Sequence, residues 1–420
     1  MKRYALLVIG SGPAGVSAAR GYLDAGGRGP VCLVSSDGDA PYERPPLSKE
    51  VLAGQSAPQG DPIDGESLPE AVELRLATTV SHVDPGERTV TAGEEMLGYD
   101  QLVVATGAGP LALPSVDPDA DVHSLRSLDD ARRLTRSAEH ARTALVIGSG
   151  FIGCEAAASL AARGIDTTMV TVEAAPQRGR LGEHAAAAIT DWLTGAGVTV
   201  RTGVSVTAVR APRTVHLDAD GAASTLTPDL VLVAIGVEPG AEFLGDSGLQ
   251  VHEGRLVVDE HLQAAPGVWA AGDCARAMHA VAGRALAVEH WGDALAMGEL
   301  AGLNAAEPDR PGSWSDVPGF WSTIGEHTLK YAAWGDGHAR AEVDARPGRF
   351  TIWYGDESDR LVGVLAYNAD DDYERGEALI AQGADLAAAR AGAHPPTGSG
   401  LGSGADEVTE DSDEGVGREG

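Results

Sequence analysis

Residues 6–16 read Leu-Leu-Val-Ile-Gly-Ser-Gly-Pro-Ala-Gly-Val, a short apolar run followed by glycines spaced as G-x-G-x-x-G. The run predicts a buried strand, and the residues after the second glycine predict a helix. In such a turn Gly10 makes the tight bend, Gly12 lets the backbone approach a pyrophosphate, and Gly15 lets helix and strand pack closely. The stretch therefore predicts a dinucleotide-binding unit whose helix amides face phosphate charge.

The same plan occurs a second time. Residues 143–147 form another apolar run, and Gly148, Gly150 and Gly153 follow it with the same spacing. We expect the helix after this loop to end at Gly164, a residue type that commonly caps helices. One glycine loop is weak evidence, but two copies in strand-loop-helix context predict two nucleotide-binding domains.

Each unit predicts a ribose-binding acid about 20 residues beyond its last glycine. In the second unit that residue is Glu173, whose carboxylate favours NADH over NADPH, although Arg178 and Arg180 leave NADPH open. In the first unit the count reaches Ser35, and the acid that follows is Asp37. A solvated turn acid is nearly as good an interpretation of Asp37, because it begins an Asp-Gly-Asp turn.

Composition excludes several classes of partner. The chain has 420 residues, 43% of them hydrophobic, and its 62 acidic against 31 basic residues give a formal charge of -31. Such a charge disfavours nucleic acid and anionic membrane surfaces as partners. The apolar run near the start is short and ends in glycines, so we interpret it as a strand and expect a cytoplasmic location.

The cysteines and histidines predict neither a dithiol centre nor a metal site. Cys32, Cys154 and Cys274 are far apart and form no C-x-x-C pair, which argues against a dithiol reductase. All three lie in apolar or glycine-rich stretches and are expected to pack. The 12 histidines are scattered without metal-ligand spacing, so we expect no protein-bound metal.

Alternating apolar strands and Ala-rich helical stretches predict an α/β fold with parallel sheets. After Pro318 the pattern becomes β-rich, with strands expected over residues 328–334, 350–354 and 361–367 and a helix over about 371–382. This part predicts a small α+β domain. From Ala391 onward the chain is rich in Gly, Ser, Pro and acid, which predicts a disordered acidic tail.

Residues 41–49 read Pro-Tyr-Glu-Arg-Pro-Pro-Leu-Ser-Lys, a motif far more specific than either glycine loop. With it, the chain closely resembles the FAD-dependent ferredoxin and rubredoxin reductases that serve oxygenases, relatives of apoptosis-inducing factor. The match covers roughly residues 1–320 well and the remainder loosely. Further family-like pieces follow in the family's order, at residues 105–107, 125–131, 234–239, 271–275, 289–291 and 318–321.

The chain also departs from this family at two places. The family usually has an acid where Ser36 stands, and an Asp-Gln-type pair where Thr323 and Ile324 stand. The first departure weakens the assignment of Asp37, and the second concerns the surface that would meet a partner.

The resemblance implies two Rossmann-like dinucleotide-binding domains followed by a small α+β C-terminal domain. The expected FAD-binding domain has two parts, residues 1–112 and 240–317, and the NAD-binding domain lies between them at residues 113–239. The C-terminal domain is expected at residues 318–390 and the tail at residues 391–420.

Two residues are implied to act in catalysis. By resemblance, Lys49 lies beside the flavin and pairs with Glu155, which faces the nicotinamide, so that the pair holds both rings in register. Lys49 is one of only three lysines, with Lys2 and Lys330, in a chain whose other basic side chains are arginine. Glu155 could instead serve only as a first-turn acid that stabilises its helix N-terminus.

The remaining implied roles concern cofactor binding. Asp273 would bond the FAD chain, Arg44 and Arg126 would counter phosphate charge, and Trp291 and Trp321 would flank the isoalloxazine, although any one of these could be a packing or ion-pair residue. The full set of expected cofactor-binding residues is Gly10, Gly12, Pro13, Ala14, Gly15, Ser36, Asp37, Arg44, Lys49, Val80, Ala105, Thr106, Gly107, Arg126, Gly148, Gly150, Ile152, Gly153, Glu155, Glu173, Gly236, Gly272, Asp273, Glu289, His290, Trp291 and Trp321.

The leading hypothesis is an FAD-dependent NADH:ferredoxin oxidoreductase that passes electrons to a small iron–sulfur ferredoxin, or a rubredoxin, serving an oxygenase. Two alternatives remain open: an NADH-dependent reductase or oxidase acting on oxygen, a quinone or another small acceptor, and a redox-responsive interaction protein. Because ferredoxins are commonly acidic and this chain is too, we expect either an Arg-bearing patch near the flavin edge or a high working salt.

Overall fold

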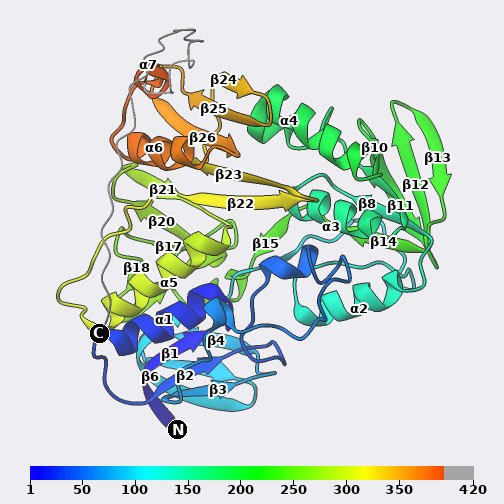
Figure 1. Cartoon of the computed structure of the whole chain (residues 1–420). Helices are drawn as coiled ribbons and strands as arrows, with labels where there is room; N and C mark the ends of the chain where they lie inside the picture. Colours follow the sequence, from blue (N-terminus) through cyan, green and yellow to red (C-terminus); the bar gives the residue numbers. More distant parts are fainter. Residues whose placement is uncertain (392–420) are drawn as a thin grey trace, which may run out of the picture.

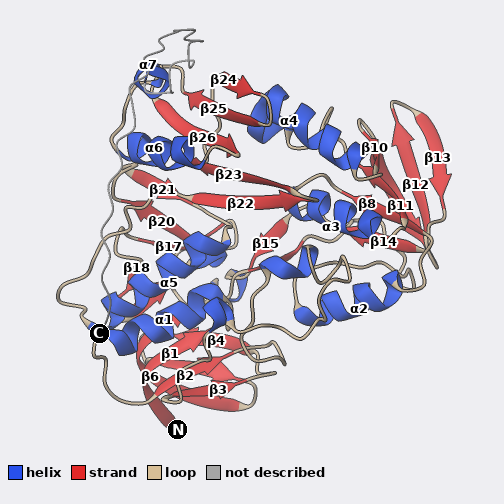
Figure 2. Ribbon diagram, viewed as in Figure 1, coloured by secondary structure: helices blue, strands red, loops and turns tan. Residues whose placement is uncertain are grey.

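The computed structural model describes residues 1–391, and residues 392–420, which hold nearly all of the expected tail, lie outside the described part. Figure 1 follows the chain through three groups of sheets, and Figure 2 separates helices from strands. Between residues 1 and 391, no helix is both long and apolar enough to cross a membrane.

The first sheet is built from both early and late parts of the chain. It has eight strands, with the order β18-β19-β6-β1-β2-β3 and a β4–β5 hairpin attached to β6. Its strands are β1 (Lys2–Ile9), β2 (Val31–Val34), β3 (Val72–Arg75), β4 (Val80–Asp84), β5 (Thr89–Ala92), β6 (Glu95–Val104), β18 (Gln263–Ala265) and β19 (Val268–Ala270). A smaller sheet joins it, made of β16 (Val251–His252), β17 (Arg255–Val258), β20 (Ala275–His279) and β21 (Arg284–Leu286).

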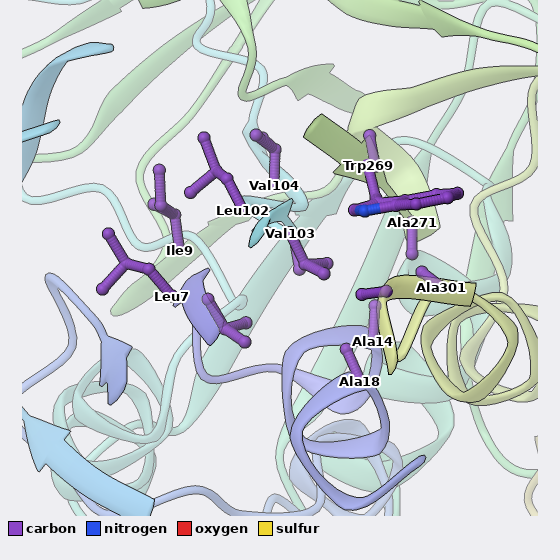
Figure 3. Packing of buried hydrophobic residues seen from close by; sticks show 14 of the residues in the cluster. Leu7, Ile9, Ala14, Ala18, Leu102, Val103, Val104, Trp269, Ala271 and Ala301 are labelled. Carbon is purple, nitrogen blue, oxygen red and sulfur yellow. The ribbon is translucent and has the colours of Figure 1, made fainter. Parts of the chain in front are cut away.

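Two helices, α1 (Pro13–Asp24) and α5 (Trp291–Ala306), run side by side against this first sheet (Figure 1). Their backbones touch because glycines stand where they meet: a Cβ on Gly298 would lie 2.2 Å from the carbonyl oxygen of Ala14. Figure 3 shows Ala14, Ala18 and Ala301 between these helices and the strands. The small residues therefore bring the N-termini of both helices to one end of the sheet.

The second parallel sheet has the order β10-β9-β8-β14. Its strands are β8 (Thr143–Ile147), β9 (Asp166–Val170), β10 (Thr199–Arg201) and β14 (Leu230–Val233), with helices α2 (Leu128–Ala138), α3 (Phe151–Ala162) and α4 (Arg178–Gly195) around them. An antiparallel sheet of β11 (Ser205–Arg210), β12 (Thr214–Ala219) and β13 (Ala222–Leu226) extends this part. The two chain crossings to the first sheet pair with each other as β7 (Ala108–Pro110) and β15 (Val237–Pro239).

The last part is an antiparallel sheet with the order β22-β23-β26-β25-β24. Its elements are β22 (Gly319–Ile324), β23 (His327–Ala333), β24 (Arg340–Arg346), β25 (Arg349–Gly355), β26 (Leu361–Tyr367), α6 (Asp370–Ala381) and α7 (Leu386–Ala391). Four short 3-10 helices complete the described elements: η1 (Pro45–Ser48), η2 (Ile63–Gly65), η3 (Glu242–Leu244) and η4 (Gly272–Cys274).

The structure corrects three expectations for this last part. Strand β22 carries the Phe-Trp motif that the sequence left unassigned, and β24 was not expected at all. Ala391 was expected to begin the tail but is the last residue of α7, which is held because Leu386 and Ala389 are buried against the sheet. The other strands and α6 agree with expectation to within one or two residues.

Within the first sheet, β2, β19 and the second half of β1 are buried on both faces, which explains their unbroken apolar runs. In Figure 3, Leu7 and Ile9 of β1 lie on the side of Leu102 and Val104 of β6, and the ring of Trp269 from β19 lies farther along, toward Ala301 of α5. The glycine loop after β1 therefore begins from a rigid, fully packed strand.

His279, at the end of β20, is fully buried. The amide of Ala282 donates to its Nδ1 at 3.0 Å, so its Nε2–H donates to the Asp316 carbonyl at 2.9 Å. The rings of Trp314 and Trp334 lie against it. Burial lowers the pKa of His279, because a charged ring would lose hydration and its Nδ1 could no longer accept.

Candidate functional site

A cleft of about 1890 Å³ runs along the carboxyl ends of both parallel sheets. The first glycine loop lines one part of it, and Gly150 and Ile152 of the second loop line another. Phe320 and Trp321 of β22 line it where the last sheet meets the other two. A single cleft therefore receives both predicted nucleotide sites.

The two glycine loops have matching geometry. Gly10 and Gly148 have φ angles of +112° and +105°, a region that side chains rarely adopt. A Cβ on Gly10 would lie 2.1 Å from the Ala105 carbonyl oxygen, and one on Gly148 would lie 2.3 Å from that of Ala234. Each turn therefore lies directly against the end of a neighbouring strand, and only glycine fits.

Three of the expected cofactor-binding glycines do not line the cleft. Gly15 and Gly153 face back into their own turns, where a Cβ would lie 1.9 Å and 2.3 Å from the carbonyl oxygens of Gly10 and Gly148. Gly148 likewise lies behind the lining. These three glycines therefore allow the turns to form, the role expected of Gly15, and their neighbours line the cleft.

Two arginines face the first glycine loop. The guanidinium of Arg44 lies 3.7 Å from where a Cβ on Gly12 would stand, and its buried Nε has no hydrogen-bond partner among the described residues. Burial, and then the nearby Arg126, lower the pKa of Arg44. Arg126 donates to Asp273 at 2.8 Å. A half-buried arginine with an unpartnered Nε, beside a glycine turn and a helix N-terminus, fits the pyrophosphate of FAD.

The acid of the first unit has other partners. Asp37 accepts from the Tyr42 hydroxyl at 2.8 Å and from the Asp39 amide at 3.0 Å, while still lining the cleft beside Ser36. The interpretation of Asp37 as a turn acid therefore holds for Oδ1, which accepts the Asp39 amide. Inside the loop, the hydroxyls of Ser11 and Ser35 lie 2.7 Å apart and tie the turn to the end of β2.

The acid of the second unit is differently placed. Glu173 lines the cleft, and its buried Oε2 has no partner among the described residues, so it is available to a ribose hydroxyl. Arg178 pairs with Glu183 instead of lining the cleft, whereas Arg180 does line it. Of the two arginines that left NADPH open, only Arg180 is in position to meet a nucleotide.

Lys49 and Glu155 meet at the junction of the three sheets. Lys49 Nζ lies 2.9 Å from Glu155 Oε2, and both side chains are largely buried. The Ser48 hydroxyl donates to the same oxygen at 2.6 Å. On the other oxygen, Oε1, the Ser322 hydroxyl donates at 2.7 Å and the Thr323 amide at 3.1 Å. Glu155 therefore accepts four hydrogen bonds, which is far more than a first-turn helix acid needs.

The start of α5 forms the far wall of the cleft. His290 and Trp291 line it, and His290 Nδ1 lies 2.7 Å from the buried carboxylate of Asp293. Burial raises the pKa of Asp293, against the lowering effect of His290. Glu289 also lines the cleft but forms an ion pair with Arg255. Trp321 remains 45% exposed at the mouth.

Comparison with known proteins shows the family of this chain. Residues 4–298 match the model of the pyridine nucleotide-disulphide oxidoreductase family. The chain belongs to this family. Rubredoxin-NAD(+) reductase from Pseudomonas putida is 31% identical over 330 residues, covering 75% of this chain and 85% of that protein. Rhodocoxin reductase from Rhodococcus erythropolis is 32% identical over 402 residues, covering 90% and 89%.

A solved structure agrees with this assignment. The covalent complex of putidaredoxin reductase with putidaredoxin has a chain that superposes with a TM-score of 0.81 at 27% identity, covering 91% of this chain and 93% of that one. The predictions of a ferredoxin and rubredoxin reductase family, an α/β fold and an oxidoreductase are confirmed.

The three cysteines of this chain form no disulphide with one another. Cys32, Cys154 and Cys274 are free and buried. Burial raises the pKa of Cys32 to about 11 and also raises the pKa of Cys154 and Cys274. Within residues 1–391, no three His, Cys, Asp or Glu side chains gather as they would around a metal ion.

Apart from the three inward glycines, every expected site residue lines the cleft, Val80, Thr106, Gly107, Gly236 and Gly272 among them. Sequence reasoning missed Asp293, Ser322 and Thr323. The spacing of His290 and Asp293, three residues apart at a helix start, offered a signal for the first. The sequence offered none for the other two, because they reach Glu155 from 167 and 168 residues away.

Arg255, Arg284 and Lys330 do not supply the expected basic patch. Arg255 pairs with Glu289, Arg284 with Asp336, and Lys330 with Asp370 at 2.9 Å. Each positive charge is therefore offset by an acid beside it.

Proposed function

We propose that this chain is an FAD-dependent NADH:ferredoxin oxidoreductase, which passes electrons from NADH to a small iron–sulfur ferredoxin or a rubredoxin that serves an oxygenase. The relatives named above, a rubredoxin reductase and a putidaredoxin reductase, support the acceptor class. The family supports FAD and NADH as cofactors. We further propose a cytoplasmic location, where NADH is available.

The observation that carries the proposal is the single cleft with the Lys49–Glu155 pair between its two glycine loops. Bound FAD would accept a hydride from NADH as two electrons and release them singly to a one-electron carrier. The protein's own contribution is placement and electrostatics.

In this proposal the chain divides its work by region. Residues 1–112 and 240–317 bind FAD, residues 113–239 bind NADH, and residues 318–390 complete the flavin end of the cleft. Arg44, with Arg126 behind it, would hold the FAD pyrophosphate. Glu173 would accept from the NADH ribose, and its charge would repel a 2′-phosphate.

The residues around the two rings would act by position. The ammonium of Lys49 would lie beside the flavin and the carboxylate of Glu155 would face the nicotinamide carboxamide, with His290, Trp291 and Trp321 bordering the flavin. Because Lys49 and Glu155 neutralise each other, neither group would leave an unpaired buried charge when the cleft fills and water leaves.

Anaerobic stopped-flow mixing with NADH tests the first half of the reaction. The absorbance of the oxidised flavin should fall after mixing with NADH. A protein that keeps its oxidised spectrum would refute the proposal. Turnover with the cognate iron–sulfur protein, compared with a quinone and with oxygen, tests the second half. Faster turnover with the quinone would favour the small-acceptor alternative.

A further inference from the structure

The carboxylate of Glu155 is held from two directions by different parts of the chain. Ser48 and Lys49, from the motif that precedes the second glycine loop, donate to Oε2. Ser322 and Thr323, from β22 in the last sheet, donate to Oε1 at 2.7 Å and 3.1 Å. Both oxygens of one carboxylate are thus fixed, and the group cannot turn without breaking bonds on both sides.

Strand β22 is well suited to this contact. It lies at the edge of its sheet, so its outward amides have no neighbouring strand, and that of Thr323 is satisfied by Glu155. Ser322 is 1% exposed, and a buried hydroxyl is costly without a partner.

Helix α3 presents a continuous face to these partners. Phe151, at its start, packs against Phe320 of β22 with ring centroids 4.6 Å apart. One turn later comes Glu155, and one turn after that Ser159 donates to the Ser48 carbonyl at 2.7 Å. In Figure 1, β22 points at the start of α3. The last sheet therefore packs directly on the turn of α3 that carries the carboxylate.

We propose that Ser322, together with the Thr323 amide, positions Glu155 for hydride transfer, so that the C-terminal domain completes the hydride-transfer site. The inference rests on the proposed function. Ser322 acts through Glu155, as a positioning residue. If the β22 donors were removed, Ser48 and Lys49 would still hold Oε2, but Oε1 would have no donor and the carboxylate could rotate.

The test compares two variants of the holoenzyme that each lose one buried hydroxyl from the last sheet. Ser322→Ala removes a donor to Glu155, whereas Thr351→Val removes a donor to Asp372 at 2.8 Å and does not touch Glu155. A hydrogen bond to a charged group corresponds to roughly a tenfold effect or more. At saturating NADH, Ser322→Ala should slow anaerobic flavin reduction roughly tenfold with a nearly unchanged Kd for NADH, and Thr351→Val should not.

A second measurement does not depend on turnover. The chain has three lysines, so reductive ¹³C-methylation labels Lys2, Lys49, Lys330 and the amino terminus alone. The Lys49 resonance, assigned with Lys2→Arg and Lys330→Arg, should shift in Ser322→Ala, because Glu155 moves, and stay in place in Thr351→Val. Ser322→Thr, which keeps the hydroxyl, should recover the wild-type resonance and rate.

The outcomes separate this inference from the proposed function. Normal reduction of Ser322→Ala, or equal slowing by Thr351→Val, would overturn the positioning role while leaving the oxidoreductase intact. An unshifted Lys49 resonance in Ser322→Ala would also overturn it. Failure of NADH to reduce the wild-type flavin would overturn both.

Discussion

Replacing Glu155 by glutamine should break one particular hydrogen bond of the site. A carboxylate accepts at both oxygens, whereas an amide must turn its NH₂ toward one side. Thr323 offers a backbone N–H fixed in β22, and Lys49 offers an ammonium that already has the Pro45 carbonyl as a second partner at 3.0 Å. The amide nitrogen should therefore face Ser48 and Lys49; the Ser48 hydroxyl can turn and accept from it, whereas Lys49 can only donate and should lose Glu155.

The magnitude follows from the bond lost. Hydrogen bonds to charged groups contribute about 1.5–3 kcal/mol, and each 1.4 kcal/mol is a factor of ten in rate. If the pair acts on the transition state, Glu155→Gln should slow flavin reduction by roughly 10- to 150-fold. The fold should persist, because glutamine keeps the volume and the Ser322 and Thr323 bonds.

The assay is anaerobic stopped-flow reduction by NADH, followed at the flavin band. Lys49→Met removes the same pair, so the double variant should be slowed little more than either single variant. Asp229→Asn is the matched control, since this carboxylate accepts the Arg142 amide at 2.9 Å outside the cleft. Wild-type rates in Glu155→Gln, or multiplying effects in the double variant, would refute the reasoning.

Three other changes have definite expected outcomes. Gly298→Ala places a Cβ 2.2 Å from the Ala14 carbonyl oxygen and should lower the free energy of unfolding by about 1–3 kcal/mol and loosen FAD, whereas Gly195→Ala meets nothing within 4 Å and should do neither. Calorimetry and retained flavin absorbance measure both, and equal stability of the two variants would contradict the close-contact argument. Because burial lowers the pKa of His279, the unfolded chain takes up its proton first, and stability should fall as pH drops below about 6.5, by up to about 1.4 kcal/mol per pH unit. Urea unfolding at about pH 7.5 and 5.5 should show a smaller loss in His279→Gln, and an unchanged loss would assign the effect elsewhere. Glu173→Gln should reduce kcat/KM for NADH roughly tenfold and raise the relative use of NADPH, because it removes the charge that we propose to accept from a ribose hydroxyl. Steady-state kinetics with both nucleotides measure this, and an unchanged preference would remove Glu173 from the nucleotide site.

The glycine loops could be predicted from sequence because their conformation is decided locally. A buried strand, a turn of positive φ at Gly10 and a helix beginning at Pro13 all lie within a short segment, and the segment at Gly148 repeats them. The same locality explains why counting along one βαβ unit led to Glu173, which lines the cleft. The burial of the strands before the two loops could be predicted because both are apolar runs.

The sequence alone could not say which oxygens of an acid would be free. Asp37 and Glu173 hold similar places in their units, yet Asp37 bonds to Tyr42 and Asp39 while Glu173 keeps an unpartnered oxygen. That difference depends on which side chains fold back over each turn. The pairing of Lys49 with Glu155 came from family resemblance, since nothing in either segment names the other.

By itself, then, the order of residues determined two nucleotide-binding units, an oxidoreductase family and most of the cleft lining, because those features come from short segments with their own backbone preferences. Only the tertiary structure decided that β22 would close on α3 and give Glu155 its Ser322 and Thr323 donors. That contact joins residues more than 160 positions apart, and it exists because the edge strand of one sheet packs against the first turns of a helix from another.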